Sequence, residues 1–133
     1  MRFLSIYKTR ETGVPPTLEH MAAMTALIEE SMKSGELLAT EGCLPTALGA
    51  RVRLSGGTVT VTDGPFSEAK EVVGGFAILQ ANSKNEAIEM VKRFLKVAGD
   101  GECEIRQVFD APDQSASTAE KTEALAGQFN PGR

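Results

Sequence analysis

A single histidine and a loop carboxylate are the residues of this chain best suited to acid–base chemistry. His20 lies in the first turn of a predicted helix, and an imidazole exchanges protons near neutral pH. A lone histidine in a helix is, however, more often a surface residue or a helix-start residue. Asp63 follows a predicted strand and precedes Gly64-Pro65, so its carboxylate either accepts hydrogen bonds from turn amides or stands at a pocket rim. Both residues are catalytic candidates.

Charged residues on either side of Asp63 could contact a polar ligand. Arg51 and Arg53 alternate along a predicted strand, where they form a solvated face, line a cavity for an anion, or pair with acids across an interface. Glu68, Lys70 and Glu71 form a charged triad on the loop after Asp63. This triad is either solvated, holds a polar ligand, or joins two subunits. The candidate ligand contacts are Arg51, Arg53, Glu68, Lys70, Glu71 and Tyr7.

Composition and motif content argue against several other function classes. The 133 residues include 14 basic and 18 acidic side chains, and the net charge of −4 argues against a general binder of nucleic acid or anionic membranes. Neither a phosphate-cradling glycine motif nor a serine nucleophile elbow is present. We therefore expect no nucleotide cradle and no direct contact with nucleic acid.

The cysteines and the apolar runs bear on cofactors and location. Cys43 and Cys103 lie far apart and outside any C-x-x-C pair, which, with one histidine, predicts no metal site and no cofactor. The longest apolar runs fall short of the roughly 20 residues that span a bilayer, and the N-terminus does not resemble a secretory signal. We expect a cytoplasmic protein with reduced thiols and no membrane contact.

Periodicity predicts the elements that would carry these residues. Strands are expected at residues 2–8, 36–40, 71–80 and 102–109. One helix is capped by Thr17 and stopped near Gly35, and a second opens at a capping box at 83–86 and ends near Gly99. Gly74-Gly75 indicates a bulge or the close approach of another group. The first helix carries an apolar stripe of Met21, Met24, Leu27, Ile28 and Met32.

The clearest local signal is a hairpin. Residues 50–54 and 58–62 flank Ser55-Gly56-Gly57, and a Gly-Gly loop suits a primed turn because both residues tolerate positive φ. This register pairs Leu54 with Val59 and Val52 with Val61. One face of the hairpin is then apolar, and the other carries the two arginines.

The element order predicts an α+β fold of the ferredoxin-like type. Strand-helix-strand, a hairpin, and a second strand-helix-strand give an antiparallel sheet with two helices on one face and an added hairpin. The other sheet face must be covered, and a second copy of the chain is the simplest cover. We place the domain at residues 1–110. Residues 111–133, rich in Ser, Thr, Ala, Gly and Glu, form a loosely held tail or a short helix.

One segment carries a family resemblance. Asp63-Gly64-Pro65-Phe66-Ser67-Glu68-Ala69-Lys70-Glu71, followed by Gly74-Gly75-Phe76, resembles the signature of the DGPF proteins of the YCII-related superfamily. That signature is D-G-P-F-A-E-T-K-E before a G-G-F or G-G-Y strand. Ser67 and Ala69 depart from it and leave the charged positions intact. The resemblance extends over roughly residues 1 to 109.

The resemblance implies a fold more firmly than an activity. It implies a dimeric α+β barrel of ferredoxin-like topology, similar to small dimeric lactone isomerases and dehalogenating lyases. Related proteins are proposed to use a His–Asp pair, and His20 lies at a similar place. The aspartate of that pair has no clear match in this sequence near Asp100. Asp63 is therefore as good a candidate as Asp100 for the acidic partner of His20. Some DGPF proteins look like neighbours of extracytoplasmic-function sigma factors.

Three functional hypotheses follow, and whether the protein is an enzyme stays open. In the first, a metal-free isomerase or lyase uses His20 or Asp63 as base, with Arg51 or Arg53 stabilising an enolate or carboxylate. In the second, a non-catalytic homodimer binds a small molecule or a regulatory protein such as a sigma factor. In the third, the dimer is purely structural.

Overall fold

Four strands form one antiparallel sheet in the computed structural model, which describes residues 1–129. The sheet order is β2-β5-β1-β6. The hairpin β3-β4 is inserted between β2 and β5. The remaining elements follow the order strand-helix-strand-strand-helix-strand, so the fold is ferredoxin-like, as predicted. The bounds are β1 Arg2–Thr9, α1 Leu18–Lys33, β2 Leu37–Gly42, η1 Thr46–Leu48, β3 Ala50–Ser55, β4 Thr58–Asp63, β5 Val72–Gln80, α2 Lys84–Ala98, β6 Glu102–Gln107 and α3 Thr118–Gln128.

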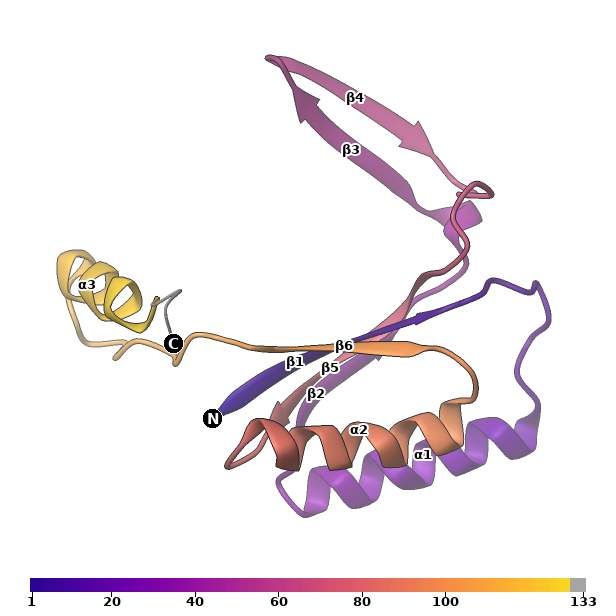
Figure 1. Ribbon diagram of the computed structural model, residues 1–133, viewed down its shortest axis with the longest axis horizontal. Coiled ribbons are helices and arrows are strands. Elements are labelled where there is room, and N and C mark those ends of the chain that lie inside the picture. The colour runs from indigo at the N-terminus through magenta and orange to yellow at the C-terminus, as the bar shows by residue number, and fades with distance from the viewer. Residues whose placement is uncertain (130–133) are drawn as a thin grey trace.

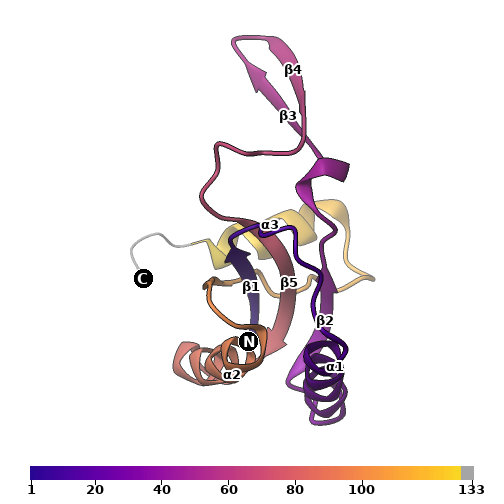
Figure 2. The same cartoon turned by 90° about the vertical axis from the view of Figure 1, so that its right-hand side faces the viewer.

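The two long helices begin and end where the sequence predicts. Thr17 Oγ1 accepts a hydrogen bond of 3.1 Å from the His20 N–H, and Ser83 Oγ accepts one of 3.1 Å from the Glu86 N–H. Gly35 and Gly99 take φ values of +81° and +96° just beyond the two helices. Both helices lie on the same face of the sheet (Figures 1 and 2).

The buried core lies mainly under α2. Phe3 from β1 and Leu79 from β5 pack with the buried face of α2, where Ala87, Met90 and Val91 lie. Of the 16 described residues of α1, none is buried. The first helix is therefore attached to the sheet less tightly than the second.

A bulge in β5 lets the ring of Tyr7 lie close to the backbone of that strand. The pairing of β1 with β5 shifts after Tyr7, which leaves Gly74 as the extra residue. A Cβ on Gly74 would lie 3.3 Å from the Tyr7 ring, and a Cβ on Gly75 would lie 2.7 Å from the carbonyl oxygen of Glu41. The expected glycine pair thus provides both the bulge and the close approach.

The face of the sheet opposite the helices is open. Leu4 and Ile6 of β1 pair with Ile78 and Phe76 of β5, so these four apolar side chains share that face. Phe76 is 38% exposed and the other three are half-buried. We call these four residues the open sheet face.

The hairpin forms in the predicted register and projects away from the sheet. Val52 pairs with Val61 and Leu54 with Val59. Gly56 and Gly57 have φ values of +57° and +81°, as a primed turn requires. Figure 1 shows the hairpin rising from one end of the sheet and leaning back over the open side.

The C-terminal segment forms a helix beyond the end of the sheet. A reciprocal capping box between Ser117 and Glu120 starts α3. The Gln128 side chain ties the helix to the backbone of Asp110. The domain boundary near residue 110 stays a prediction, and residues 130–133 of the predicted tail lie outside the described part. Within residues 1–129, no helix has the length and apolar character needed to span a bilayer.

Candidate functional site

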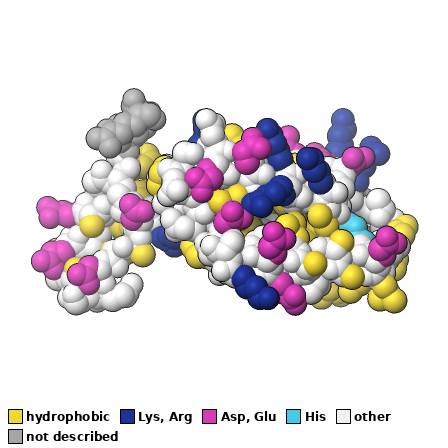
Figure 3. All heavy atoms as spheres, turned by 90° about the horizontal axis from the view of Figure 1, so that it is seen from below, with side chains coloured by type: hydrophobic (Ala, Val, Ile, Leu, Met, Phe, Trp, Pro, Cys, Tyr) yellow, Lys and Arg dark blue, Asp and Glu magenta, His cyan; other side chains and the backbone are white. Residues whose placement is uncertain are grey.

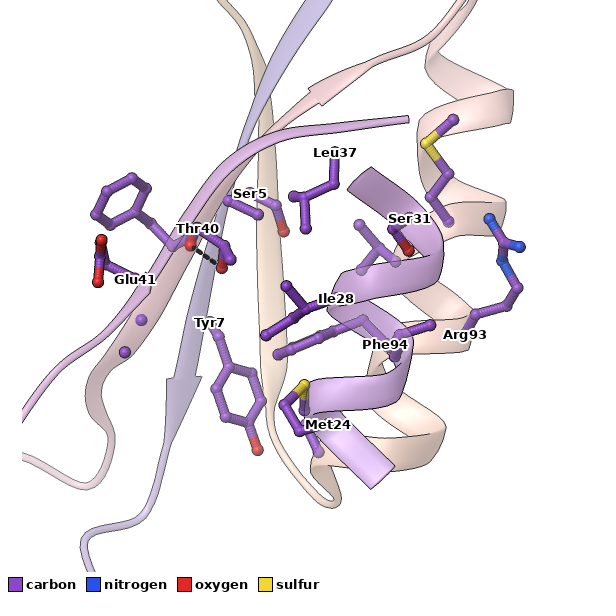
Figure 4. Close-up of a pocket in the computed structure, with 18 of the residues that line it drawn as sticks. Ser5, Tyr7, Met24, Ile28, Ser31, Leu37, Thr40, Glu41, Arg93 and Phe94 are labelled. Carbon is purple, nitrogen blue, oxygen red and sulfur yellow. Dashed lines mark hydrogen bonds between the residues drawn. The ribbon is translucent and has the colours of Figure 1, made fainter. Parts of the chain in front are cut away.

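A cavity of about 390 Å³ lies between α1, α2 and the sheet. In the close-up, Tyr7, Met24, Ile28 and Phe94 point toward one another at one end of this cavity (Figure 4). Four residues of the stripe of α1 that was predicted as a helical face, Met21, Met24, Leu27 and Ile28, form one wall, whereas Met32 lies outside the lining. Because α1 buries none of its residues, its apolar side chains border the cavity, and Ile28 also packs against the edge of the core.

Tyr7 is fixed at the floor of the cavity. Its hydroxyl donates to the carbonyl oxygens of Asp100 at 3.0 Å and Gly99 at 3.3 Å. Its ring meets Phe94 edge-on, with centroids 5.2 Å apart and planes at 84°. A Cβ on Gly101 would lie 2.6 Å from the ring, so the loop after α2 closes directly onto it. These contacts hold the aromatic floor in one orientation.

Few polar groups line the cavity, and two pairs of them are already engaged. The Arg93 guanidinium of α2 donates to the Glu36 carboxylate at 2.6 Å. Thr40 Oγ1 donates to the Phe76 carbonyl at 2.8 Å (Figure 4). Arg93 is 51% exposed, so a bound anion could reach its remaining N–H groups. The wall is otherwise largely apolar, which suits an apolar ligand with one polar or charged group.

His20 borders this same cavity. It belongs to the first turn of α1, where only its backbone N–H takes part in the helix cap. Viewed from the helix side, the chain's single histidine lies at the surface beside hydrophobic side chains (Figure 3). Among residues 1–129, the hydrogen bonds and ion pairs of the structure include none from its imidazole to another side chain. The ring is thus available to a ligand.

Asp63 lies elsewhere, at the base of the hairpin. Its backbone pairs with Ala50, and the residue is exposed. It is outside the lining of the cavity, and so is Asp100, whose carbonyl rather than carboxylate contacts Tyr7. Within one chain, the structure therefore brings Tyr7 and His20 together and leaves both candidate acids apart from them.

Arg51 and Glu68 fasten the hairpin to the loop that follows it. The Arg51 guanidinium stacks over the Phe66 ring at 3.9 Å from its centroid and forms an ion pair with Glu68. A backbone hydrogen bond and the Arg51 hydrogen bond hold the pKa of Glu68 below its ordinary value. Arg51 therefore pairs with an acid of its own chain, whereas the sequence suggested a solvated face, a cavity for an anion, or an acid across an interface.

A second set of contacts holds the hairpin base from below. The Glu11 carboxylate accepts from Thr46 N–H and from Thr46 Oγ1–H, each at 2.6 Å, and Thr46 Oγ1 accepts from Phe66 N–H at 3.2 Å. These bonds hold the pKa of Glu11 below its ordinary value. A Cβ on Gly64 would collide with the Thr46 carbonyl, so only glycine fits there. The contacts of Glu11, Thr46, Arg51, Phe66 and Glu68 form what we call the hairpin joint.

The remaining candidates are exposed and separate from the His20 cavity. Lys70 borders a second hollow, which Arg10, Glu11 and Glu68 also line. Arg53 lies on the polar face of the hairpin opposite Thr60, and Glu71 precedes β5.

Thiol and metal chemistry have little support in the described chain. Burial raises the pKa of the Cys103 thiol, which opposes formation of a nucleophilic thiolate. Within residues 1–129, no three or more His, Cys, Asp or Glu side chains gather in a group that could hold a metal ion.

Sequence reasoning named Tyr7 and His20 but missed Arg93 and Phe94 of α2. The apolar period of α2 marks Phe94 as inward-facing without showing that it borders a cavity. Arg93, beside it, reads as a solvated residue. The one available signal was the methionine stripe of α1, since methionine is frequent at adaptable binding surfaces.

Comparison with known proteins places this geometry in context. A family model described as the YCII-related domain matches residues 1–112. An uncharacterized protein of Rhizobium meliloti (strain 1021) is 32% identical over 72 residues, 54% of this chain and 58% of that protein, so the match spans less than two thirds of its relative. A solved structure of 5-chloro-2-hydroxyhydroquinone dehydrochlorinase from Burkholderia phenoliruptrix, in complex with 2,5-dihydroxybenzoquinone, aligns with a TM-score of 0.49 and 20% identity, covering 81% of this chain and 93% of that one.

Proposed function

The chain belongs to the YCII-related domain family, and on that premise we propose that its cavity beneath α1 binds a small, largely apolar molecule with which His20 exchanges a proton. The reaction class is a metal-free isomerisation or elimination. Membership of the DGPF branch stays a prediction from the motif.

The observation that carries this proposal is an apolar cavity with one free imidazole at its border. A volume of about 390 Å³ falls in the range of roughly 300–1,000 Å³ that is usual for small-molecule sites. Tyr7 and Phe94 offer aromatic surface to a ring, and Met24 adapts to its outline. A ligand of one substituted ring therefore suits both the size and the chemistry of the site.

The residues around the cavity have different roles in the proposed reaction. His20 accepts a proton from a carbon acid next to a carbonyl group and returns it at another position, or removes it as a leaving group departs. Arg93, already held by Glu36, binds an anionic substituent of the ligand. The apolar wall excludes water and so strengthens both interactions. In a single chain, Arg93 takes the role that the sequence suggested for Arg51 or Arg53.

Deuterium exchange tests this chemistry directly. Monocyclic ketones and lactones are incubated with the protein in D₂O, and mass spectrometry follows deuterium at carbon. The wild type is expected to accelerate exchange about 100-fold or more over buffer, the usual contribution of a positioned base. His20→Asn removes the acceleration, whereas Arg53→Lys, remote on the hairpin, retains it. Equal rates for wild type and His20→Asn would contradict the proposed role of His20.

A binding protein without catalysis is the second candidate. It is favoured by the absence, within residues 1–129, of a carboxylate in contact with the His20 imidazole, because a base is usually oriented by such a partner. This candidate predicts saturable binding of a monocyclic probe with no deuterium exchange in the wild type. Under it, His20→Asn changes affinity alone.

We propose further that two copies pair through their open sheet faces. Leu4, Ile6, Phe76 and Ile78 present apolar surface that a second copy would remove from water. Analytical ultracentrifugation of Ile6→Glu is expected to show a monomer at concentrations where the wild type dimerises. A sigma-factor partner and a cytoplasmic location stay predictions from the sequence.

A further inference from the structure

The hairpin β3-β4 has no packing partner of its own. Every residue of both strands is exposed. Val52, Leu54, Val59 and Val61, which share one face, keep between 60% and 71% of their surface in water. We call these four residues the apolar hairpin face. An isolated two-stranded hairpin is marginally stable in water, and a hydrophobic surface against it is what usually stabilises one.

The hairpin is nevertheless held in a defined direction. Arg51 reaches from its polar face to Phe66 and Glu68, and the Gly64 N–H donates to the Gly49 carbonyl at 2.9 Å. The hairpin joint fixes the base of the arm while the apolar hairpin face stays uncovered. A rigid base with an exposed apolar arm is typical of an interaction element rather than of a loose loop.

The position of the arm points to a second copy of this chain. Both views show it on the side of the sheet opposite the helices, the side that carries the open sheet face (Figures 1 and 2). A molecule seated on the open sheet face therefore also comes against the hairpin. A two-fold axis would give each copy the same two contacts, which makes the surfaces self-complementary.

Area and charge agree with this occupant. A stable dimer interface uses roughly 20–30 residues on each partner, and the four residues of the open sheet face, three of them half-buried, are only part of such a surface. Arg51 and Arg53 lie on the polar face of the hairpin, and Arg51 is paired with Glu68 of its own chain. The apolar hairpin face itself carries no charge, so burying it against a second copy desolvates none of the charged side chains of the arm.

We propose that the β3-β4 hairpin is a dimerisation arm that lays its apolar face, Val52, Leu54, Val59 and Val61, on a second copy of this chain. The inference rests on the pairing of open sheet faces proposed above and adds the arm to it. The signature segment after Asp63 then serves to aim the arm.

Two neighbouring positions give a matched test. Val61→Glu places a charge on the apolar hairpin face, and Thr60→Glu places the same charge one residue away on the polar face, both at exposed sites. Sedimentation equilibrium of the full chain is expected to show a dimer dissociation constant about 100-fold higher for Val61→Glu, because an unpaired charge would be buried at the contact. Thr60→Glu is expected to change it less than about 3-fold. Val61→Thr, a milder change of similar shape, is expected to raise it about 5-fold.

The outcomes separate the arm from the sheet pairing and from the cavity. The proposed role of the arm is contradicted if Val61→Glu and Thr60→Glu raise the dissociation constant equally. It is also contradicted if only Ile6→Glu weakens the dimer, and the pairing of open sheet faces is then supported without the arm. A monomeric wild type at high micromolar concentration overturns both. A monomer whose melting temperature falls in Val61→Glu alone shows the arm folding onto its own chain, which also overturns the inference. Deuterium exchange by a monomeric variant shows that the cavity functions independently.

Discussion

The two helices cover the same sheet face but are bound to it in different ways. α2 buries Ala87, Met90 and Val91 against Phe3 and Leu79, whereas α1 buries none of its 16 described residues and borders a cavity. Stability therefore comes mainly from the α2 half. The cavity lies between the two helices, because Met90 and Val91 of the core line it together with residues of α1. Side chains on its α1 wall can therefore vary at a smaller cost in stability than those on its α2 wall.

The largest expected effect is a cavity opened in the α2 half. Phe3 is 2% exposed and lies at the centre of the core, so Phe3→Ala is expected to lower the free energy of unfolding by about 3–5 kcal/mol. Urea denaturation monitored by circular dichroism measures this loss. A cost below about 1 kcal/mol would mean that the core lies elsewhere.

A pair of methionines compares the two halves with the same chemical change. Met90→Ala in α2 is expected to cost about 2–4 kcal/mol, because Met90 is 8% exposed and its removal leaves a void. Met24→Ala in α1 is expected to cost less than about 1 kcal/mol, because Met24 is only half-buried, whereas Met90 borders the cavity and is also packed in the core. Equal costs in urea denaturation would break the comparison.

A glycine at the wall of the cavity tests how closely β2 and β5 approach. Gly75→Ala would put a methyl group 2.7 Å from the Glu41 carbonyl, so the strands must separate or the backbone must bend. We expect a loss of about 1–3 kcal/mol in the free energy of unfolding. Gly42→Ala is a control on the partner strand, where a Cβ would meet open space. A neutral Gly75→Ala would contradict the close packing of β2 on β5.

The smallest effect concerns the polar contact before α1. Because the pKa of Glu11 is lower in the folded chain, its ionised carboxylate stabilises the fold above the ordinary glutamate range, and that contribution is lost as the pH falls through the folded pKa. Glu11→Gln is therefore expected to be less stable than the wild type at pH 7, and this difference is expected to be smaller at pH 3. Unfolding curves at the two pH values check this. A stability difference that does not depend on pH would contradict a stabilising role for the ionised carboxylate and its hydrogen bonds to Thr46.

Much of the fold could be predicted because local signals determine it. Thr17 and Ser83 set the starts of the helices, and the Gly56-Gly57 turn set the hairpin register, all through contacts within a few residues. The strand ends were less certain, since β2 continues to Gly42 and β6 stops at Gln107. Propensity weakens at such ends, where pairing partners decide how far a strand extends.

The candidate site was harder to predict because its residues lie far apart in the sequence and come together only in the folded chain. The stripe of α1 predicts an inward face, and the same periodicity would arise over a filled core or a cavity. Phe94 meets Tyr7, and Arg93 and His20 border the same cavity, only after both helices pack on the sheet. Arg51 and Asp63 looked close to the site in sequence terms, but the joint directs the hairpin away from the cavity. That direction depends on contacts such as Arg51 with Phe66, which no local pattern encodes.

Methyl NMR of the methionines tests ligand binding beneath α1 most directly. The chain has five methionines, of which Met21, Met24 and Met90 line the cavity, while Met1 and Met32 lie outside its lining and serve as internal controls. With ¹³C-methyl methionine and titrations of phenol and benzoate, the account predicts saturable shifts confined to the three lining methyl groups. Shifts of equal size at all five methyl groups, or none up to millimolar probe, would contradict a binding site beneath α1.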